Sequence, residues 1–217
     1  MMGLFSRKKN TSNQEITLIG IKGQIATMKC LIMAGIKNIS LKTTLAADVD
    51  VDQINSYQLL DTSDKAPKIT QGDFSVSGAR SILTYLDIRG KGNSLTPKKA
   101  RTLGEQNYWI DVCYQTLGPV TQAIMSGSAN DADNSALKQV LSSLNTCLTD
   151  NDYIVGQLSF ADPNVAAYIY ALGCAGIDLT AYPNIGDWIT RLEKDMSGPL
   201  SIEYLPMPSS HANSQVA

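Results

Sequence analysis

The stretch from Asp61 to Leu86 constrains the fold more than any other part of the sequence. Pro67 stands at the start of a short apolar run, and a proline, which cannot donate to a sheet ladder, is tolerated at the start of a strand. The triplet Gln71–Asp73 is a turn signal between this run and the next, which predicts a β-hairpin. After Ser77 the apolar residues recur at helical spacing, which predicts a helix. These residues are Ile82, Leu83, Tyr85 and Leu86.

The composition sets the broad class of the protein. Of the 217 residues, 43% are hydrophobic and 18% are charged, which is enough to build one large domain or two small ones and argues against global disorder. The formal net charge is −2, so no positive field favours nucleic acid. No apolar run is long enough for a membrane span, and residues 1–10 are too short and too weakly apolar for a signal peptide. We therefore expect a cytoplasmic protein.

The cysteines and the single histidine argue against a metal site. Cys30, Cys113, Cys147 and Cys174 lie far apart in the sequence and form no CxxC pair. We expect them to be reduced thiols on helices rather than disulfides or zinc ligands. His211 lies in a polar tail, so a histidine-based triad or zinc centre is not expected.

Before the central stretch, the sequence predicts a strand, a helix and a second strand. Residues 15–21 are rich in β-branched side chains, which is typical of a strand. Residues 24–34 carry an apolar stripe at helical spacing, and Gly35 is expected to end that helix as its C-cap. Residues 38–44 predict the second strand, and residues 48–56 predict a short irregular helix.

After the central stretch, the pattern changes to helices alone. Residues 88–96 are rich in glycine and charge and predict a connection between two domains. Thr96 as N-cap and Pro97 at the first helical position predict the start of the next helix. Its apolar and aromatic residues continue to Leu117, and Gly118–Pro119 is expected to break or kink it.

Two further helices follow. Residues 136–148 are amphipathic, and Ser159 with Asp162 forms a capping-box arrangement before a run typical of a buried helix. The expected organisation is a flexible arm (1–14), an α/β domain (15–87), a linker (88–96), an all-helical domain (97–200) and a polar tail (201–217).

The motifs of the central stretch resemble those of the glutathione transferases. That family has Asn-Pro-x-Gly-Lys-Val-Pro, a hairpin with a Gly-Asp turn, and then Glu-Ser-x-Ala-Ile-x-x-Tyr-Leu. Residues 61–67 and 78–86 align with these two motifs without a gap. Residues 153–172 and the Tyr-Pro-x-x-x-x-Trp run of residues 182–188 also resemble family elements. The resemblance covers about residues 15–195 and implies an N-terminal thioredoxin-like α/β domain followed by an all-α helical-bundle domain.

The resemblance implies that glutathione is the co-substrate and that it binds beside Pro67. It implies a cis peptide bond before Pro67, so that the Ala66 backbone pairs with the cysteinyl part of glutathione, with Lys65 adjacent. The Glu-Ser pair that holds the γ-glutamyl end is replaced here by Gly78 and Ala79, which offer backbone amides only. Each lost charge-assisted hydrogen bond is worth about 1–3 kcal/mol. Lys65, Ser77 and Arg80 are candidates to compensate.

The turn after the first strand is where the family places a Tyr, Ser or Cys that activates the glutathione thiol. Residues 20–26 contain none of these types. Two polar groups remain, the amide of Gln24, which can donate a hydrogen bond, and the charge of Lys22. They are candidate catalytic groups, and the alternative is that both are solvated turn residues. Thr27 lies within the predicted helix and is expected to be packed, and Cys30 is expected to lie in the core.

The resemblance also implies a pocket for an electrophile beside the helical domain. Tyr108, Trp109 and Cys113 are candidate lining residues, together with Tyr114. An aromatic stripe at helical spacing is more often interhelical core or a dimer interface. We expect a homodimer. We also expect it to bind either a small hydrophobic electrophile or a protein partner. The sequence therefore predicts a glutathione-transferase-like protein with an altered glutathione site, which conjugates or reduces small electrophiles, or else a non-catalytic dimerisation or scaffold module.

Overall fold

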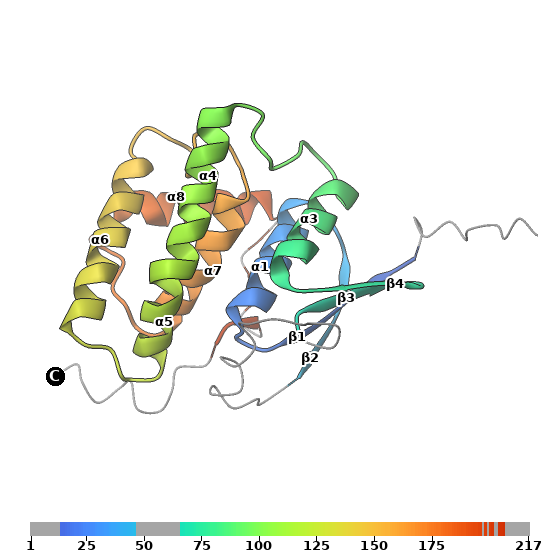
Figure 1. The fold of residues 1–217 in the computed structure, drawn as a ribbon, viewed down its shortest axis with the longest axis horizontal. Helices are drawn as coiled ribbons and strands as arrows, with labels where there is room; N and C mark the ends of the chain where they lie inside the picture. The colour runs from blue at the N-terminus through green and yellow to red at the C-terminus, as the bar shows by residue number, and fades with distance from the viewer. Residues whose placement is uncertain (1–13, 47–65, 197, 199, 202–203, 207–217) are drawn as a thin grey trace, which may run out of the picture.

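The computed structural model describes residues 14–46, 66–196, 198, 200–201 and 204–206, and these form two adjacent lobes (Figure 1). One lobe is a sheet with helices, and the other is a bundle of helices. This confirms the predicted order of a thioredoxin-like α/β domain followed by an all-α domain. The predicted helix at residues 48–56, most of the N-terminal arm, Lys65 and His211 lie outside the described residues.

The sheet contains four strands in the order β2-β1-β3-β4. Strand β1 (Ile16–Ile21) pairs in parallel with β2 (Leu41–Ala46) and antiparallel with β3 (Lys68–Gln71), and β3 forms the predicted hairpin with β4 (Phe74–Ser77). The hairpin turn contains Gly72 at φ 64°, a conformation that glycine adopts without steric cost.

Helix α1 (Ile25–Ile36) is shared between the two hydrophobic cores. Met28 and Ile32 face the helical lobe, whereas Cys30 and Met33 pack with the sheet and with α3 (Ala79–Arg89). One helix therefore holds the lobes together through opposite faces.

The end of α1 differs from the prediction. The helix continues past Gly35, and the chain turns at Asn38, whose φ is 51°, so the next strand begins at Leu41 rather than at residue 38. Gly35 has a packing role instead, because an added Cβ would lie 3.0 Å from the side chain of Met196.

The helical lobe begins later than predicted. Helix α4 starts at Ala100 with Lys99 as N-cap, so the assignment of Thr96 and Pro97 to a helix start was wrong. The amide of Thr96 instead donates to the hydroxyl oxygen of Ser94 (3.2 Å), within the connection. The remaining described elements are α4 (Ala100–Val112), η3 (Cys113–Leu117), α5 (Gly118–Met125), α6 (Asp131–Cys147), α7 (Ala161–Cys174) and α8 (Pro183–Asp195).

Gly118–Pro119 does not break the long helix. The π-helical segment η3 precedes it, and Pro119 falls in the first turn of α5, where a missing N–H is tolerated. The helical path from Ala100 to Met125 is therefore continuous, and the π-helical segment is a local widening of it.

Ser159 and Asp162 are paired at the start of α7 as predicted, although the helix itself begins at Ala161 with Phe160 as N-cap. Asp162 Oδ2 accepts the backbone N–H of Ser159 (2.8 Å), and Ser159 Oγ accepts the N–H of Ala161 (3.2 Å). Asp162 Oδ1 also accepts the N–H of Ile154 (3.2 Å) and the indole N–H of Trp188 (3.0 Å). Burial raises the pKa of Asp162 to about 6, although these donors oppose the shift. One buried carboxylate thus joins a loop, α7 and α8.

The connection between the lobes is held by a buried ion pair that the sequence did not reveal. Lys37 Nζ lies 3.1 Å from Asp87 Oδ1 and donates to the carbonyl of Asn93 (2.8 Å). Asp87 also accepts the hydroxyl of Ser94 (2.8 Å) and the N–H of Leu95 (3.0 Å). These bonds tie residues 93–95 to the end of α1 and to α3, so the middle of the connection is attached to the first lobe.

The four cysteines are all free, and Cys30 is fully buried as predicted. Within the described part of the chain, no helix is long and apolar enough to cross a bilayer. The same described residues bring together no group of three His, Cys, Asp or Glu side chains suited to a metal ion.

Candidate functional site

Three segments that the sequence singled out meet at one end of the two inner strands, β1 and β3. In the β1–β3 register Ile19 lies opposite Lys68, so the end of β1 and the turn after it lie beside Ala66 and Pro67. The N–H of Gly78 donates to the carbonyl of Pro67 (2.9 Å), which places the start of α3 at the same end of these strands. The turn before α1, the Ala66–Pro67 bond and the start of α3 therefore form one continuous site.

The Ala66–Pro67 peptide bond is cis, and Pro67 is buried. Because Pro67 is at the start of β3, the backbone of Ala66 stands at the end of the ladder between β1 and β3. An extended peptide could pair with that backbone whatever the side chain at position 66 is.

The start of α3 has no side-chain cap. Gly78 is the N-cap residue, and among the residues that the structure describes no side-chain cap bond is made to this helix start. An added Cβ at Gly78 would meet no atom within 4 Å, so a side chain at this position has room. An uncapped helix N-terminus is suited to an anion such as a carboxylate.

The backbone of Gly78 also explains part of the sequence change. Its φ is 88° and its ψ is 130°, a region that side chains rarely adopt. A glutamate here would have room for its side chain but would strain the backbone by about 1–3 kcal/mol. Glycine removes that strain together with the carboxylate.

The start of α1 contains a polar triad that sequence reasoning missed. Thr27 Oγ1 donates to Gln24 Oε1 (2.9 Å) and accepts the backbone N–H of Ile21 (3.2 Å). Gln24 is the N-cap residue and is only 7% exposed. Because the Gln24 carbonyl oxygen is occupied by Thr27, its NH₂ group is left as the donor of this turn.

Gly20 makes this triad possible. An added Cβ at Gly20 would lie 2.5 Å from Thr27 Cγ2, so a larger residue in β1 would push Thr27 away. The signal in the sequence was the glycine within a β-branched strand, which marks a close approach. Lys22, the other candidate catalytic residue, is exposed on the same turn.

The residues expected to line an electrophile pocket point in different directions. Trp109 and Cys113 belong to the core of the helical lobe, with 6% and 0% exposure. Tyr108 is 61% exposed and meets Trp109 edge-on, with ring centroids 5.8 Å apart. Burial raises the pKa of the Cys113 thiol to about 12, so it stays protonated and is a poor nucleophile near neutral pH.

Tyr114 is the aromatic residue of this helix that meets the first lobe. Lys29 Nζ of α1 lies 5.0 Å from the centre of the Tyr114 ring and 4.8 Å from that of Tyr168. Burial raises the pKa of Tyr114, and the charge of Arg80 at the start of α3 opposes that shift. The contact with Lys29 therefore places Tyr114 at the junction of the two lobes.

Lys29 was not predicted from the sequence, because it lies within the apolar stripe of the first helix. It is 3% exposed, and burial lowers its pKa. The two tyrosine rings stabilise its charge in place of water.

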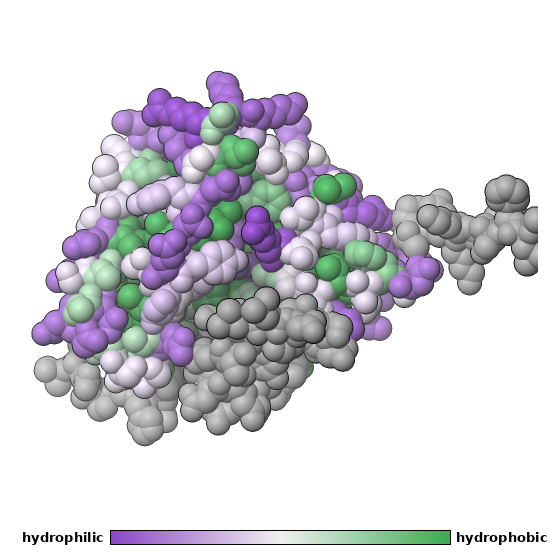
Figure 2. All heavy atoms as spheres, in the orientation of Figure 1, coloured by the Kyte–Doolittle hydropathy of each residue, from purple (hydrophilic) through white to green (hydrophobic). Residues whose placement is uncertain are grey.

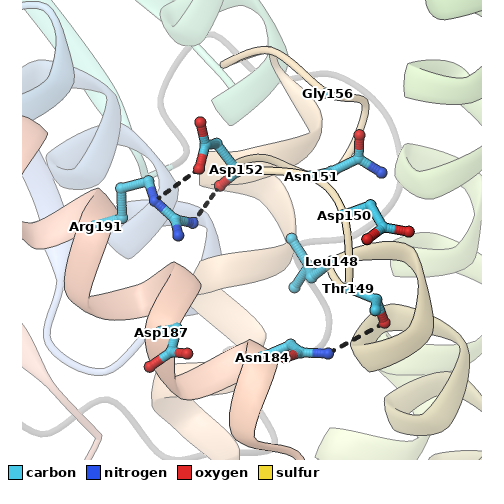
Figure 3. A pocket seen from close by; sticks show the side chains of 9 residues that line it. All are labelled: Leu148, Thr149, Asp150, Asn151, Asp152, Gly156, Asn184, Asp187 and Arg191. Atoms are coloured by element: carbon cyan, nitrogen blue, oxygen red, sulfur yellow. Dashed lines mark hydrogen bonds and ion pairs between the residues drawn. The ribbon is translucent and has the colours of Figure 1, made fainter.

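A separate polar pocket lies within the helical lobe, between the end of α6 and α8 (Figure 3). Arg191 contacts Asp152 through its side-chain carboxylate (3.4 Å) and its carbonyl (2.6 Å), and Asn184 bonds to the carbonyl of Asn145 (2.9 Å). These polar groups join α8 to the last turn of α6 and to the residues after it. The pocket contains none of the predicted site residues and was not predicted from the sequence.

Comparisons with known proteins agree with this architecture. No family model matches the sequence. A solved delta-class glutathione transferase from Nilaparvata lugens is 24% identical, with 82% of this chain and 88% of that chain covered and a TM-score of 0.65. A possible glutathione S-transferase from Rhodopseudomonas palustris is 19% identical (88% and 99% covered, TM-score 0.66). A Bombyx mori glutathione transferase is 20% identical (85% and 90% covered, TM-score 0.66). The chain shares the fold of these proteins.

Proposed function

We propose that this chain, which has the glutathione-transferase fold, binds glutathione weakly and uses its thiol to conjugate or reduce small electrophiles. The observation that carries the proposal is the hydrogen bond from the Gly78 N–H to the Pro67 carbonyl. It joins Pro67 to the uncapped start of α3 at one end of the inner strands β1 and β3. In this proposal the Ala66 backbone offers pairing to a peptide, and the start of α3 beside it offers a site for an anion. The named activity of the structural neighbours supports the same ligand class.

The peptide part of glutathione is held mainly by backbone in this proposal. The Ala66 backbone pairs with the cysteinyl unit, and the first amides of α3, with Ala79 and Arg80, take the γ-glutamyl carboxylate. The absent hydroxyl and carboxylate each remove about 1–3 kcal/mol, which predicts an affinity lower by roughly two orders of magnitude.

The thiolate is stabilised by the Gln24 NH₂ group and by the charge of Lys22. Thr27 is a positioning residue, since it keeps the Gln24 oxygen turned away from the thiolate. An amide donor polarises a thiol less than a hydroxyl next to a positive charge does, so conjugation is expected to be slow.

The electrophile is placed near Tyr114 and Arg80 rather than beside Trp109 and Cys113. Tyr114 is 55% exposed, whereas the other two side chains are in the core. This moves the predicted pocket from the bundle interior to the side of α4 and η3 that meets the first lobe.

The test is turnover of a chloronitrobenzene with glutathione by the wild type, Gln24→Ala and Lys22→Ala. We expect slow conjugation in the wild type and a further loss in both variants, with an unchanged melting temperature in Lys22→Ala and a small decrease in Gln24→Ala, which loses the bond from Thr27. Fast wild-type conjugation that survives both substitutions would contradict the assignment of this turn.

The second candidate is a dimerisation or scaffold module, and exposed apolar side chains favour it. Tyr108 of α4 is 61% exposed, Ile88 of α3 is 81% exposed, and Phe74 of β4 is 40% exposed and stacks on Tyr85 at 4.9 Å. Figure 2 shows apolar patches over both lobes on this face. A homodimer in which the sheet lobe of one copy covers the helical lobe of the other would bury them.

Sedimentation tests the dimer at micromolar concentration, where a monomer of 23.4 kDa alone would contradict it. We also propose a cytoplasmic location, because four free cysteines are typical of a reducing compartment.

A further inference from the structure

The segment Tyr204–Pro206, which we call the C-terminal strap, lies against the turn before α1. The backbone N–H of Gly23 donates to the carbonyl of Tyr204 (3.3 Å). The hydroxyl of Tyr204 lies 3.3 Å from Thr43 Oγ1 of β2, and Pro206 is buried. The strap therefore contacts both the turn and the neighbouring strand.

Gly23 allows an unusually close approach of the strap. An added Cβ at Gly23 would lie 2.7 Å from Pro206 Cα and 3.0 Å from Pro206 Cβ. The φ of Gly23 is 74°, so any other residue would be strained as well as in collision. At the same time Leu205 packs against the core of the helical lobe. The strap is thus anchored in one lobe and seated on the other.

We propose that the C-terminal strap is a built-in cover of the ligand-binding turn, which a thiol ligand has to displace in order to reach Gln24. This rests on the proposed function, because that function assigns the turn to thiol binding. Gly23 directly precedes Gln24, and the Gly23 amide that would face a thiolate at the start of α1 is already bonded to Tyr204.

A cover of this kind lowers the apparent affinity without changing any contact to the ligand. The measured dissociation constant equals the intrinsic constant divided by the fraction of molecules in which the strap is open. Weak glutathione binding would then have two separable causes, the missing groups at residues 78–79 and the closed strap.

The first test places a reporter thiol in the covered turn of the full-length protein. In a Gln24→Cys background, the rate of labelling of the introduced thiol by N-ethylmaleimide is measured with and without Pro206→Asp, which puts a charge on the buried seat. Peptide mapping separates the introduced thiol from the four native cysteines. We expect labelling to rise about 5- to 30-fold, the range for losing a local contact. Ser201→Asp is the matched control, because it adds the same charge at an exposed position three residues before the strap and should change nothing.

The second test changes the seat instead of the strap. Gly23→Ala should accelerate labelling in the turn and hydrogen exchange at the amide of residue 23, which donates to the Tyr204 carbonyl, because the added methyl collides with Pro206. Gly127→Ala is the matched control: its φ is 70°, similar to that of Gly23, but nothing lies within 4 Å of its added Cβ. Tyr204→Phe, which removes only the hydroxyl facing Thr43, provides a mild variant that retains the packing.

The outcomes separate the cover from the proposed function. Labelling is measured in the reporter background, and glutathione binding is measured by calorimetry with Gln24 in place. Faster labelling in Pro206→Asp and Gly23→Ala, with tighter glutathione binding, supports both. Faster labelling without detectable glutathione binding in any variant supports the cover and counts against the glutathione function. Labelling rates equal to those of the two controls would overturn the cover.

Discussion

Two helix starts in this molecule treat the same unsatisfied N–H groups in opposite ways. At α7, Asp162 and Ser159 supply side-chain acceptors, and the carboxylate is buried among four donors. At α3, Gly78 supplies none, and a side chain at this position has room. The comparison teaches that a start with side-chain acceptors joins several elements of the bundle, whereas the bare start of α3 has the positive end that the proposed ligand site requires.

The largest expected effect comes from removing the cap of α7. Asp162→Ala leaves buried donors of Ser159, Ile154 and Trp188 without acceptors, so we expect a loss of about 3–5 kcal/mol in the free energy of unfolding. Urea denaturation measures this. The control is Asp133→Ala in the capping box of α6, where the bond to the N-cap amide is exposed to solvent and its loss should cost only about 0.5–2 kcal/mol.

The same carboxyl gives a pH dependence. Burial raises the pKa of Asp162 from its ordinary value of 3.8 to about 6, so the folded state binds more protons than the unfolded state between these values. Its contribution to stability is therefore fully present below about pH 4 and is lost as the pH rises through about 6, by at most about 1.4 kcal/mol per pH unit. The difference in unfolding free energy between wild type and Asp162→Asn should fall over this range. A difference that rises with pH would show that the four donors outweigh burial.

The bare start of α3 is tested by giving it a side-chain acceptor. Ala79→Ser adds a hydroxyl where the backbone is helical, so we expect about 5- to 30-fold tighter glutathione binding, equivalent to about 1–2 kcal/mol. Gly78→Glu adds a carboxylate but also strains a backbone with φ 88°, so its gain and cost should roughly cancel. Calorimetry compares the two variants. A larger gain from Gly78→Glu than from Ala79→Ser would contradict this account of the glycine.

An effect of similar size is expected at the start of α1, where a side chain supplies one acceptor for a backbone N–H. Thr27→Val keeps the shape but removes the acceptor for the Ile21 N–H and the donor to Gln24, at a cost of about 1–2 kcal/mol in unfolding free energy. Thr84→Val, whose hydroxyl bonds to Arg80 on the exposed face of α3, should change stability by less than about 0.5 kcal/mol. If both variants are equally stable, the triad of Ile21, Gln24 and Thr27 has no structural weight.

The sequence predicted those features that depend on neighbours in the chain. The hairpin at Gln71–Asp73 and the Ser159–Asp162 cap follow from turn and capping chemistry within a few residues. The start of α4 was predicted too early, because Thr96 has cap chemistry but its amide bonds to Ser94 instead.

The features that were missed depend on partners far apart in the chain. Three such pairs meet only in the folded tertiary structure: Lys37 with Asp87, Thr43 with Tyr204, and Lys29 with Tyr168. The altered Gly78–Ala79 pair was visible in the sequence, but the φ of Gly78, which decides what may replace it, was not.

The central claim is that a weak site for a thiol-containing peptide lies at one end of the inner strands β1 and β3, between the starts of α1 and α3. The most direct measurement is a titration of glutathione into ¹⁵N-labelled protein, followed by backbone amide shifts. The account predicts shifts at Gln24, Ala66, Gly78 and Ala79 that saturate only at about 1 mM or above. Saturation at micromolar glutathione, or shifts confined to the polar pocket around Asn184 and Arg191, would contradict it.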